Sequence, residues 1–434
     1  MTSPTRFRVR LEARYLPILL GLILLLQLII PHKSWMILLV GLGGAWLIGN
    51  RWAYSLARSL ELTRERRFGW TQVGDNLQER FTLTNRGWAT ALWVTVRDHS
   101  TLPSYQASKV RTVGGRALIH WFTDGVCYRR GLFTLGPTTL ETGDPFGFYR
   151  VTIDYPGLST MMVMPPIVKL PAIDIASAAR VGEGRPIAER TPDRSVSAAG
   201  VREFAQGDSL HRIHWPTSAR RDDLFVRIFE RTPASDWWIF LDLYQQVQAG
   251  VGQNASEEQA IVLAASLASQ GLEGGTAVGL VASGLGQGAV WLPPKLGDDQ
   301  RWRILRELAL VEPGDQPLAR QLAGASAALK GRSSLIIITA DIEGQWLDPM
   351  LLLMRRGIIP TVLVLDRAAF GGQGDADGAI GSLLELGVTH HRVRPDLLER
   401  PEMQPGQIGK WRQTPRGHWE PRFDHEALDW RELT

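Results

Sequence analysis

The chain has 434 residues, with 48 Lys and Arg against 44 Asp and Glu. This length accommodates two or three domains with cores of their own. The formal net charge of +4 excludes a polycation that coats nucleic acid by counterion release, so we expect no nucleic-acid partner. Cys127 is the single cysteine, which excludes an internal disulfide and a zinc site built on several thiolates.

Two apolar runs without a formal charge, residues 15–30 and 35–49, lie near the N-terminus. At 1.5 Å per residue the first covers roughly 24 Å, short of the ~30 Å hydrocarbon core of a bilayer, so flanking residues must snorkel or the bilayer must thin. A cleaved signal peptide and a buried core pair are the alternatives. The second run begins with Trp35 where a signal peptide would have a small-residue cleavage site. We therefore expect segment 1–58 to form a two-helix membrane hairpin, with helices at about 15–30 and 35–52.

Arginines lie on both flanks of the expected hairpin, whereas its connecting loop offers His32 and Lys33. The flanking residues are Arg6, Arg8, Arg10 and Arg14 before it and Arg51, Arg58, Arg64, Arg66 and Arg67 after it. By the positive-inside bias, both ends of the hairpin are cytoplasmic. We expect a two-pass protein of the inner (plasma) membrane with both termini and the main body in the cytosol.

Short segments of period two follow the hairpin. "FTLTN" and "LWVTV" each alternate apolar and polar residues and are joined across the turn "NRGWAT", and further short strands are expected at 117–122 and 131–136. In "GDPFGFY", Asp144 before Pro145 initiates a turn that Gly147 relieves. The pattern predicts an antiparallel, Ig-like β-sandwich over 59–166. A Pro- and Ala-rich connector is expected at 167–200.

From Trp237 onward, short apolar strands alternate with helical stretches. We expect strands at 237–242, 276–283, 334–341 and 358–366, and helices at 256–271, 299–311, 316–330 and 345–356. Ser256 and Gln259 have the spacing of a capping box for the first helix, and Gly271 is its expected stop. Buried strands separated by helices predict a parallel, doubly wound, Rossmann-like sheet.

The carboxyl ends of the expected strands carry Asp242, Asp341 and Asp366. Ligands of doubly wound sheets bind at this edge. The polar tail, 396–434, contains Trp411 and Trp419, and the sequence does not decide whether it packs on the body or on a partner.

The segment 207–230 concentrates charged side chains, yet catalytic signatures are scarce: there is no phosphate loop, no HExxH helix and no GxSxG elbow. His211 and His214 are three apart, which allows a shared metal on a helix but not on a strand. The arginines of this segment alternate with acids, which favours ion pairs over a nucleic-acid patch. We expect Trp215 to be a buried anchor, and Cys127, without an assignable base, to be a packed thiol.

The stretch "VREFAQGDSLHRIHWPTSARRDDLFVRIFE" resembles the signature of the domain of unknown function 58. The matching positions are Arg202, Glu203, Phe204, Gly207, Asp208, Arg212, Ile213, His214, Trp215, Ser218, Ala219, Arg220, Leu224, Val226, Arg227 and Glu230. "RRGLFTLGP" and "DPFGFY" resemble the upstream pattern of the same family. From these positions we expect Asp208, Arg212 and Arg220 to pair around Trp215.

The resemblance implies that residues 201–395 combine the signature segment with a von Willebrand factor A-like domain. Such domains often bind a divalent cation through D-x-S-x-S at the end of the first strand, with a Thr and an Asp from later loops, a hard-cation site of oxygen ligands. Here Asp242 and Asp341 match, whereas Tyr244 and Gln246 stand where the serines would be. Asp242, Gln246 and Asp341 are therefore candidates for a degenerate Mg²⁺ or Mn²⁺ site, and no cofactor is expected otherwise.

Three functions remain open. Family members often accompany AAA-type ATPases of the MoxR class and other membrane proteins, which implies a membrane-anchored, non-enzymatic interaction or assembly protein. The second hypothesis is a metal-dependent ligand-binding protein. The third is an enzyme that uses His211, His214 or Asp208.

Overall fold

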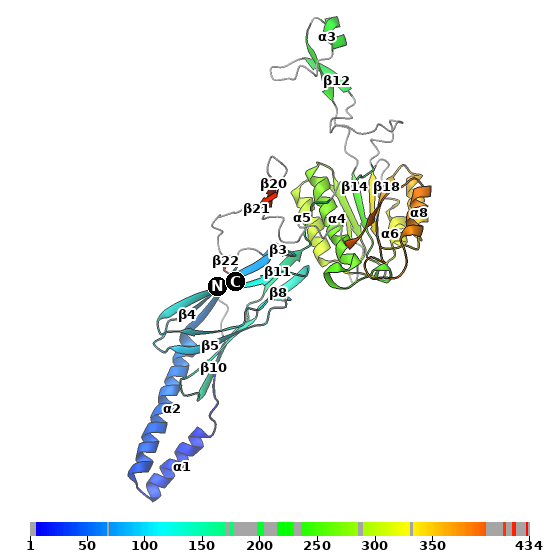
Figure 1. Ribbon diagram of the computed structural model, residues 1–434. Coiled ribbons are helices and arrows are strands. Elements are labelled where there is room, and N and C mark those ends of the chain that lie inside the picture. The colour runs from blue at the N-terminus through cyan, green and yellow to red at the C-terminus, as the bar shows by residue number, and fades with distance from the viewer. Residues whose placement is uncertain are drawn as a thin grey trace. The chain divides into compact units, whose positions relative to one another are not determined.

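The computed structural model describes residues 6–66, 69–103, 105–170, 173–176, 198–203, 215–221, 223–229, 236–284, 290–329, 333–395, 411–413, 419–421 and 431–432 (Figure 1). The chain divides into two compact units. One comprises Met1–Val168 with Leu308–Leu310 and Pro401–Thr434, and the other the remainder of Lys169–Arg400.

Two antiparallel helices, α1 (Leu16–Ile29) and α2 (Lys33–Ser59), project from the strands of the first unit (Figure 1). The His32 imidazole accepts a 3.2 Å hydrogen bond from the Ser34 N–H and so caps α2. By length and composition α2 is able to cross a membrane, whereas α1 is shorter. The predicted end of the second helix at residue 52 is wrong, because α2 continues and buries Leu56 and Ala57 in the core of the strands below.

The strands of the first unit form sheets that pack around a shared apolar core. The five-stranded sheet has the order β1 (Arg6–Leu11), β10 (Tyr149–Tyr155), β9 (Thr138–Gly143), β5 (Ala91–Asp98), β6 (Lys109–Val113). A four-stranded sheet has the order β22 (Arg431–Glu432), β2 (Leu60–Arg66), β4 (Asn76–Asn85), β7 (Ala117–Val126). A three-stranded sheet has the order β3 (Trp70–Gln72), β11 (Ser159–Met164), β8 (Gly131–Leu135).

Two expectations for this unit are wrong. The N-terminal segment is more than a flank of the hairpin, because β1 pairs antiparallel with β10 from Arg6 opposite Asp154 to Leu11 opposite Tyr149. The segments around "NRGWAT" do not pair with each other: β4 pairs with β2 and β7, and β5 with β6 and β9. A register shift in β5 also leaves Leu92 exposed, although Val94 is buried.

The predicted turn "GDPFGFY" is present and contacts α2. Asp144 accepts hydrogen bonds from the N–H groups of Phe146 (2.9 Å) and Tyr149 (2.5 Å), and Gly147 has φ of +74°. A Cβ added to Gly49 of α2 would lie 3.0 Å from Oδ2 of Asp144. The glycine therefore permits the close approach that joins the helix to the strands.

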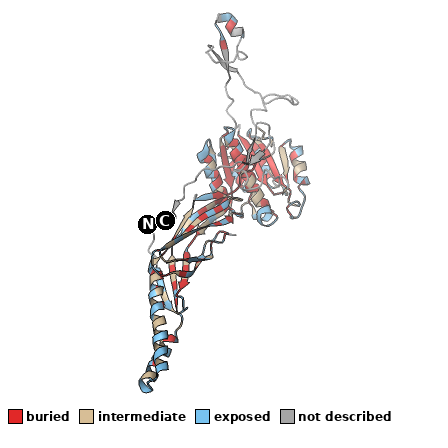
Figure 2. Cartoon of the chain, turned by 60° about the vertical axis from the view of Figure 1, so that its left-hand side comes forward, coloured by how far each residue is buried: buried red, intermediate tan, exposed pale blue. Residues whose placement is uncertain are grey.

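The second unit contains a six-stranded sheet of the order β16 (Val290–Lys295), β15 (Val278–Ala282), β14 (Trp237–Leu241), β17 (Ser334–Thr339), β18 (Ile359–Leu365), β19 (Thr389–Val393). All neighbours pair in parallel except β15 with β16. The helices are α4 (Ser256–Glu273), α5 (Asp298–Leu310), α6 (Leu318–Ala325), α7 (Leu347–Met354) and α8 (Asp377–Glu385). They cover both faces of the sheet (Figure 1), and its central strands are buried (Figure 2), which explains their continuous apolar runs.

Helix α4 begins at the predicted residue, yet its ends differ from the predicted chemistry. Ser256 makes no capping hydrogen bond: its hydroxyl accepts from the Ala249 N–H and donates to Gln248. Gly271 lies inside the helix, where an added Cβ would be 2.6 Å from the Trp237 ring. It is a packing glycine that lets α4 approach β14.

Candidate functional site

The strand order creates a switch point between the central strands β14 and β17. The chain leaves β14 toward β15 on one side and later returns to β17 on the other. Asp242 follows β14 and Asp341 follows β17, so both lie at the carboxyl edge where doubly wound sheets bind their ligands. The structure thus brings together the two acids that the sequence analysis singled out.

Asp242 is buried and held by hydrogen bonds on both carboxylate oxygens. Its Oδ2 accepts from the Thr339 hydroxyl at 2.6 Å, and its Oδ1 accepts from the Tyr244 N–H at 3.1 Å. Burial raises the pKa of Asp242 to about 6, although both hydrogen bonds act in the opposite direction; the nearby charge of Asp341 adds to the increase. The carboxyl group is therefore poised to take up a proton a little below neutral pH.

Asp341 anchors the loop after β17. Its N–H donates to Thr339 Oγ1 at 2.9 Å, its Oδ1 accepts from the Glu343 N–H at 2.8 Å, and its carbonyl accepts from Trp346 Nε1 at 3.1 Å. Burial is the largest cause that raises the pKa of Asp341. Thr339 links the two acids by donating to one and accepting from the backbone of the other, and sequence analysis missed it because no acidic or metal motif marks it.

The third candidate ligand, Gln246, differs chemically from this pair because it carries a neutral amide in place of a carboxyl group. It is exposed in the short 3₁₀ helix Gln245–Val247. Within the residues that the structure describes, no three Asp, Glu, His or Cys side chains gather as a metal-binding group. Asp366 is the next acid along the edge, and it faces Arg392 and Arg394 at 3.8 and 3.3 Å.

The signature segment is described in part. Arg202 and Glu203 lie on β12 (Ala198–Glu203), which pairs antiparallel with β13 (Phe225–Phe229), where Arg227 lies. Helix α3 (Trp215–Arg221) carries Ser218, whose hydroxyl accepts a 2.9 Å hydrogen bond from the Phe225 N–H. Gly207, Asp208, His211, Arg212, His214 and Glu230 lie outside the described residues.

The prediction that Trp215 is a buried anchor is wrong. The side chain is 65% exposed at the start of α3, and Ser218, one turn on, is the buried residue that meets the strand. Arg220 is also exposed. Its expected pairing with Asp208 and Arg212 lies outside the described residues.

A buried ion-pair network in the first unit was not foreseen. The Arg64 guanidinium, on β2, contacts the Glu79 carboxylate at 2.6 Å and Asp98 at 2.9 Å, and Tyr105 donates to Glu79. Burial lowers the pKa of Arg64, but the charge of Glu79 and the hydrogen bonds to it outweigh that effect, so the net shift is upward. In the sequence, Arg64 stands among the arginines that flank the predicted hairpin, and no local signal indicates its acidic partners, which are 15 and 34 residues away.

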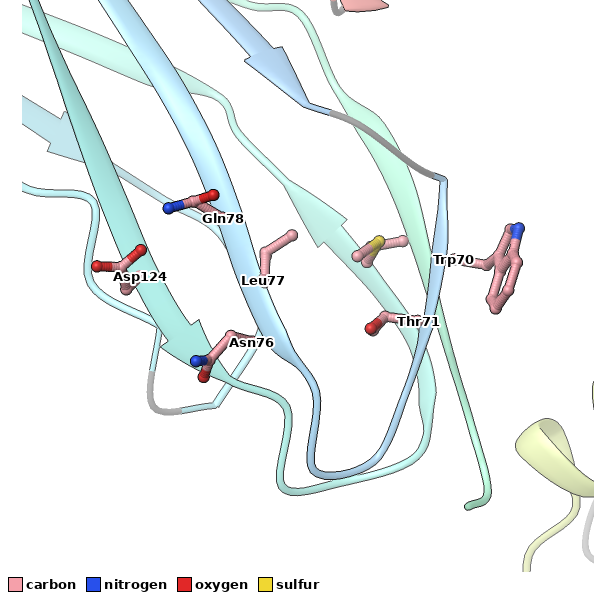
Figure 3. A pocket seen from close by; sticks show the side chains of 7 residues that line it. Trp70, Thr71, Asn76, Leu77, Gln78 and Asp124 are labelled. Atoms are coloured by element: carbon pink, nitrogen blue, oxygen red, sulfur yellow. The ribbon is translucent and has the colours of Figure 1, made fainter. Parts of the chain in front are cut away.

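A cavity of about 280 Å³ also lies in the first unit. It is lined by Trp70, Thr71, Asn76, Leu77, Gln78, Asp124 and Met161. Strands β3, β4 and β7 and the strand β11 that carries Met161 supply these residues (Figure 3). Among the described residues that line it, Asp124 is the single titratable one, and these residues therefore offer no pair for acid–base chemistry.

Cys127, which follows the cavity residue Asp124 by three positions, is fully buried. Burial raises its pKa to about 11. The thiol is therefore protonated at neutral pH, and the thiolate form that a nucleophile requires is scarce.

Comparison with known proteins matches residues 200–394 to a family described as "Protein of unknown function DUF58". The uncharacterized protein Rv1480 of Mycobacterium tuberculosis is 25% identical over 171 residues, which are 38% of this chain and 53% of that protein. The uncharacterized protein YeaD of Bacillus subtilis is 27% identical over 117 residues, 27% of either chain. The chain thus spans about half the length of the first of these relatives, and neither carries an assigned activity.

Among solved structures, the CARDB domain of the PF1109 protein from Pyrococcus furiosus, in complex with di-metal ions, is similar to part of this chain. The match has 10% sequence identity and a TM-score of 0.18, and covers 24% of this chain and 94% of that domain. This similarity is too low to carry a property of that domain over.

Proposed function

We propose that this chain is a membrane-anchored interaction protein that docks a partner and catalyses no reaction itself. In this proposal the α1–α2 hairpin crosses the inner membrane twice and the first unit is cytoplasmic. The second unit is a von Willebrand factor A-like docking domain, and its partner is a MoxR-class AAA ATPase.

Helix α2 carries the proposal. Its part up to Ile48 presents exposed apolar side chains, among them Ile37, Val40 and Leu47, while the part that follows buries Ala53 and Leu56 in the core of the strands. Figure 2 shows this change from exposed to buried along the helix. Contiguous exposed apolar surface of this kind is a property of membrane or interaction segments, and the buried half makes it a rigid extension of the folded unit.

Extraction of native membranes at alkaline pH tests the anchor. The full chain is expected to stay in the membrane pellet, and its release to the supernatant would contradict the anchor. Proteolysis of a C-terminal tag in inside-out but not right-side-out vesicles is expected for the cytoplasmic orientation.

Affinity capture tests the docking role. The exposed Glu343 lies on the loop after β17, at the carboxyl edge of the sheet. The exposed Glu385 is the last residue of α8, just before the chain enters β19 at the amino edge. Because ligands of such sheets bind at the carboxyl edge, Glu343→Lys is expected to lose the ATPase and Glu385→Lys to retain it. Equal recovery with both variants would place docking elsewhere, and no ATPase with the parent would remove that partner.

A second candidate function is a cation-dependent docking domain. The observation in its favour is the buried Asp242 beside Asp341. Titration with Mg²⁺ or Mn²⁺ would then raise the unfolding temperature of the parent but not of Asp242→Asn, since a ligand that binds the folded state stabilises it. No heat of binding and no thermal shift would remove this candidate.

An enzymatic role remains a separate prediction, because His211, His214 and Asp208 lie outside the described residues. A reaction that is lost in His214→Ala while the fold is retained would be its minimum evidence.

A further inference from the structure

We infer that the end of the first unit next to the helical hairpin is an interfacial surface that lies in the headgroup layer of an anionic bilayer. This inference rests on the proposed membrane anchor and deepens it. We call this surface the membrane-proximal rim. It consists of the aromatic residues Tyr15, Tyr54, Trp88, Trp93 and Phe146 and the basic residues Arg10, Arg14 and Arg51, all of them exposed.

The loops that carry the rim aromatics Trp88 and Phe146 contact α2 after its exposed apolar residues end at Ile48. The rings of Trp52 and Trp88 meet edge to face at 5.1 Å, and Trp52 Nε1 donates to the Thr90 carbonyl at 3.0 Å. The loop that carries Trp88 is thereby held against α2.

A second loop reaches the same level of the helix. Asn50 Nδ2 donates to the Tyr149 hydroxyl at 3.1 Å, and the turn with Phe146 contacts α2 at Gly49. A Cβ on Gly143, at the start of this turn, would be 3.2 Å from the Trp93 ring. Two loops from distant parts of the sequence thus present exposed aromatic rings beside the point where α2 turns polar.

The length of the hairpin decides where this level falls. Helix α1 has 14 residues, and the apolar part of α2 has a similar length, so each covers about 21 Å at 1.5 Å per residue. The hydrocarbon core of a bilayer is about 30 Å thick. Because the apolar helices are too short to hold the folded unit away from the membrane, the rim lies within the interfacial layer, where Trp and Tyr side chains are preferred.

The charge of the rim fits an anionic surface. Arg10, Arg14 and Arg51 have no acidic partner at ion-pair distance among the described residues. By contrast, Arg150 on the neighbouring strand is paired with Glu12 at 3.2 Å. Unpaired basic side chains near a membrane are attracted to anionic lipid, which favours phosphatidylglycerol-type headgroups as the ligand.

Single-cysteine labelling of the full chain in vesicles of phosphatidylcholine and phosphatidylglycerol tests the inference. In a Cys127→Ala background, an environment-sensitive fluorophore is attached at Trp88→Cys, Phe146→Cys, Leu132→Cys or Ile37→Cys. Leu132, on β8 at the opposite end of this unit from the hairpin (Figure 1), is 53% exposed, against 48% for Phe146, and is the matched control. Spin labels are placed on the lipid headgroup or deep in the acyl chain.

The expected result is quenching at positions 88 and 146 by the headgroup label, no quenching at 132, and quenching at 37 by the deep label. If labels at positions 88 and 146 are as unquenched as the label at 132 while the label at 37 is still quenched, the interfacial position of the rim is overturned and the anchor stays intact. No quenching at 37 would remove the anchor as well. Quenching at 146 should weaken in Arg14→Glu/Arg51→Glu, and unchanged quenching would overturn the contact with anionic headgroups.

Discussion

Thr339 donates a 2.6 Å hydrogen bond to the buried carboxylate of Asp242, across the two central strands of the parallel sheet. The same hydroxyl oxygen accepts from the Asp341 N–H at 2.9 Å. One threonine therefore ties the end of β14 to the loop after β17 at the switch point. The arrangement supports an acidic edge held rigid by hydrogen bonds.

The carboxyl group of Asp242 should give the second unit a measurable pH dependence. In the unfolded chain it loses its proton near its ordinary pKa of 3.8, whereas burial keeps it protonated in the folded state up to about pH 6. Between these values the folded state binds more protons, so the free energy of unfolding falls as the pH rises, by about 3 kcal/mol for a shift of this size.

Asp242→Asn should remove this decrease of the free energy of unfolding with pH. The parent should therefore lose stability relative to the variant between pH 4 and pH 6. Thr339→Val removes a hydrogen bond that lowers the pKa of Asp242. The pH range over which the free energy of unfolding falls should therefore extend above pH 6. Chemical denaturation across this range measures both. Parallel pH profiles of parent and Asp242→Asn would refute the assignment.

Arg64 should be among the most sensitive positions of the first unit. Arg64→Met leaves the carboxylates of Glu79 and Asp98 buried without their cation, which costs roughly 3–5 kcal/mol. Arg8 pairs with Asp154 on the surface at 2.7 Å, and Arg8→Met should cost less than about 1 kcal/mol. Denaturation midpoints that shift equally for the two variants would contradict the buried network.

Adding even a methyl group at Gly271 should lower the stability of the second unit. Its Cβ would lie 2.6 Å from the Trp237 ring, so Gly271→Ala overpacks the contact of α4 with β14 and should destabilise the second unit by about 1–3 kcal/mol. Gly381 in α8 has no neighbouring heavy atom within 4 Å of such a Cβ. Gly381→Ala should therefore be neutral or stabilising by up to about 1 kcal/mol through helix propensity, and thermal unfolding distinguishes the two outcomes.

Gly49 should determine whether α2 joins the first unit rigidly. Gly49→Leu places a branched side chain against Asp144 and Phe148, so we expect faster proteolysis between hairpin and strands in the detergent-solubilised chain. Gly41→Leu, with open space around its Cβ, should digest like the parent. Identical digestion of all three would show that the close approach is dispensable.

Much of the secondary structure of the second unit could be predicted from local pattern. The apolar strands β14, β17 and β18 lie within a residue or two of their predicted ranges, because a strand buried on both faces must be apolar throughout. Helix α8 and strands β16 and β19 were missed. Strand β16 contains two prolines, which remove backbone donors and mask the strand pattern.

The sequence by itself determined the apolar hairpin, the alternating strands, the α/β rhythm and the acids at the ends of β14 and β17, since each is written in the spacing of neighbouring residues. Tertiary structure alone decided which distant groups meet. Arg64 forms ion pairs with Glu79 and Asp98, and Thr339 donates a hydrogen bond to Asp242. Strand β1 pairs with β10, and two loops bring aromatic side chains to α2. These contacts join residues far apart along the chain, and their energies arise from burial and charge pairing that exist only once the chain has folded.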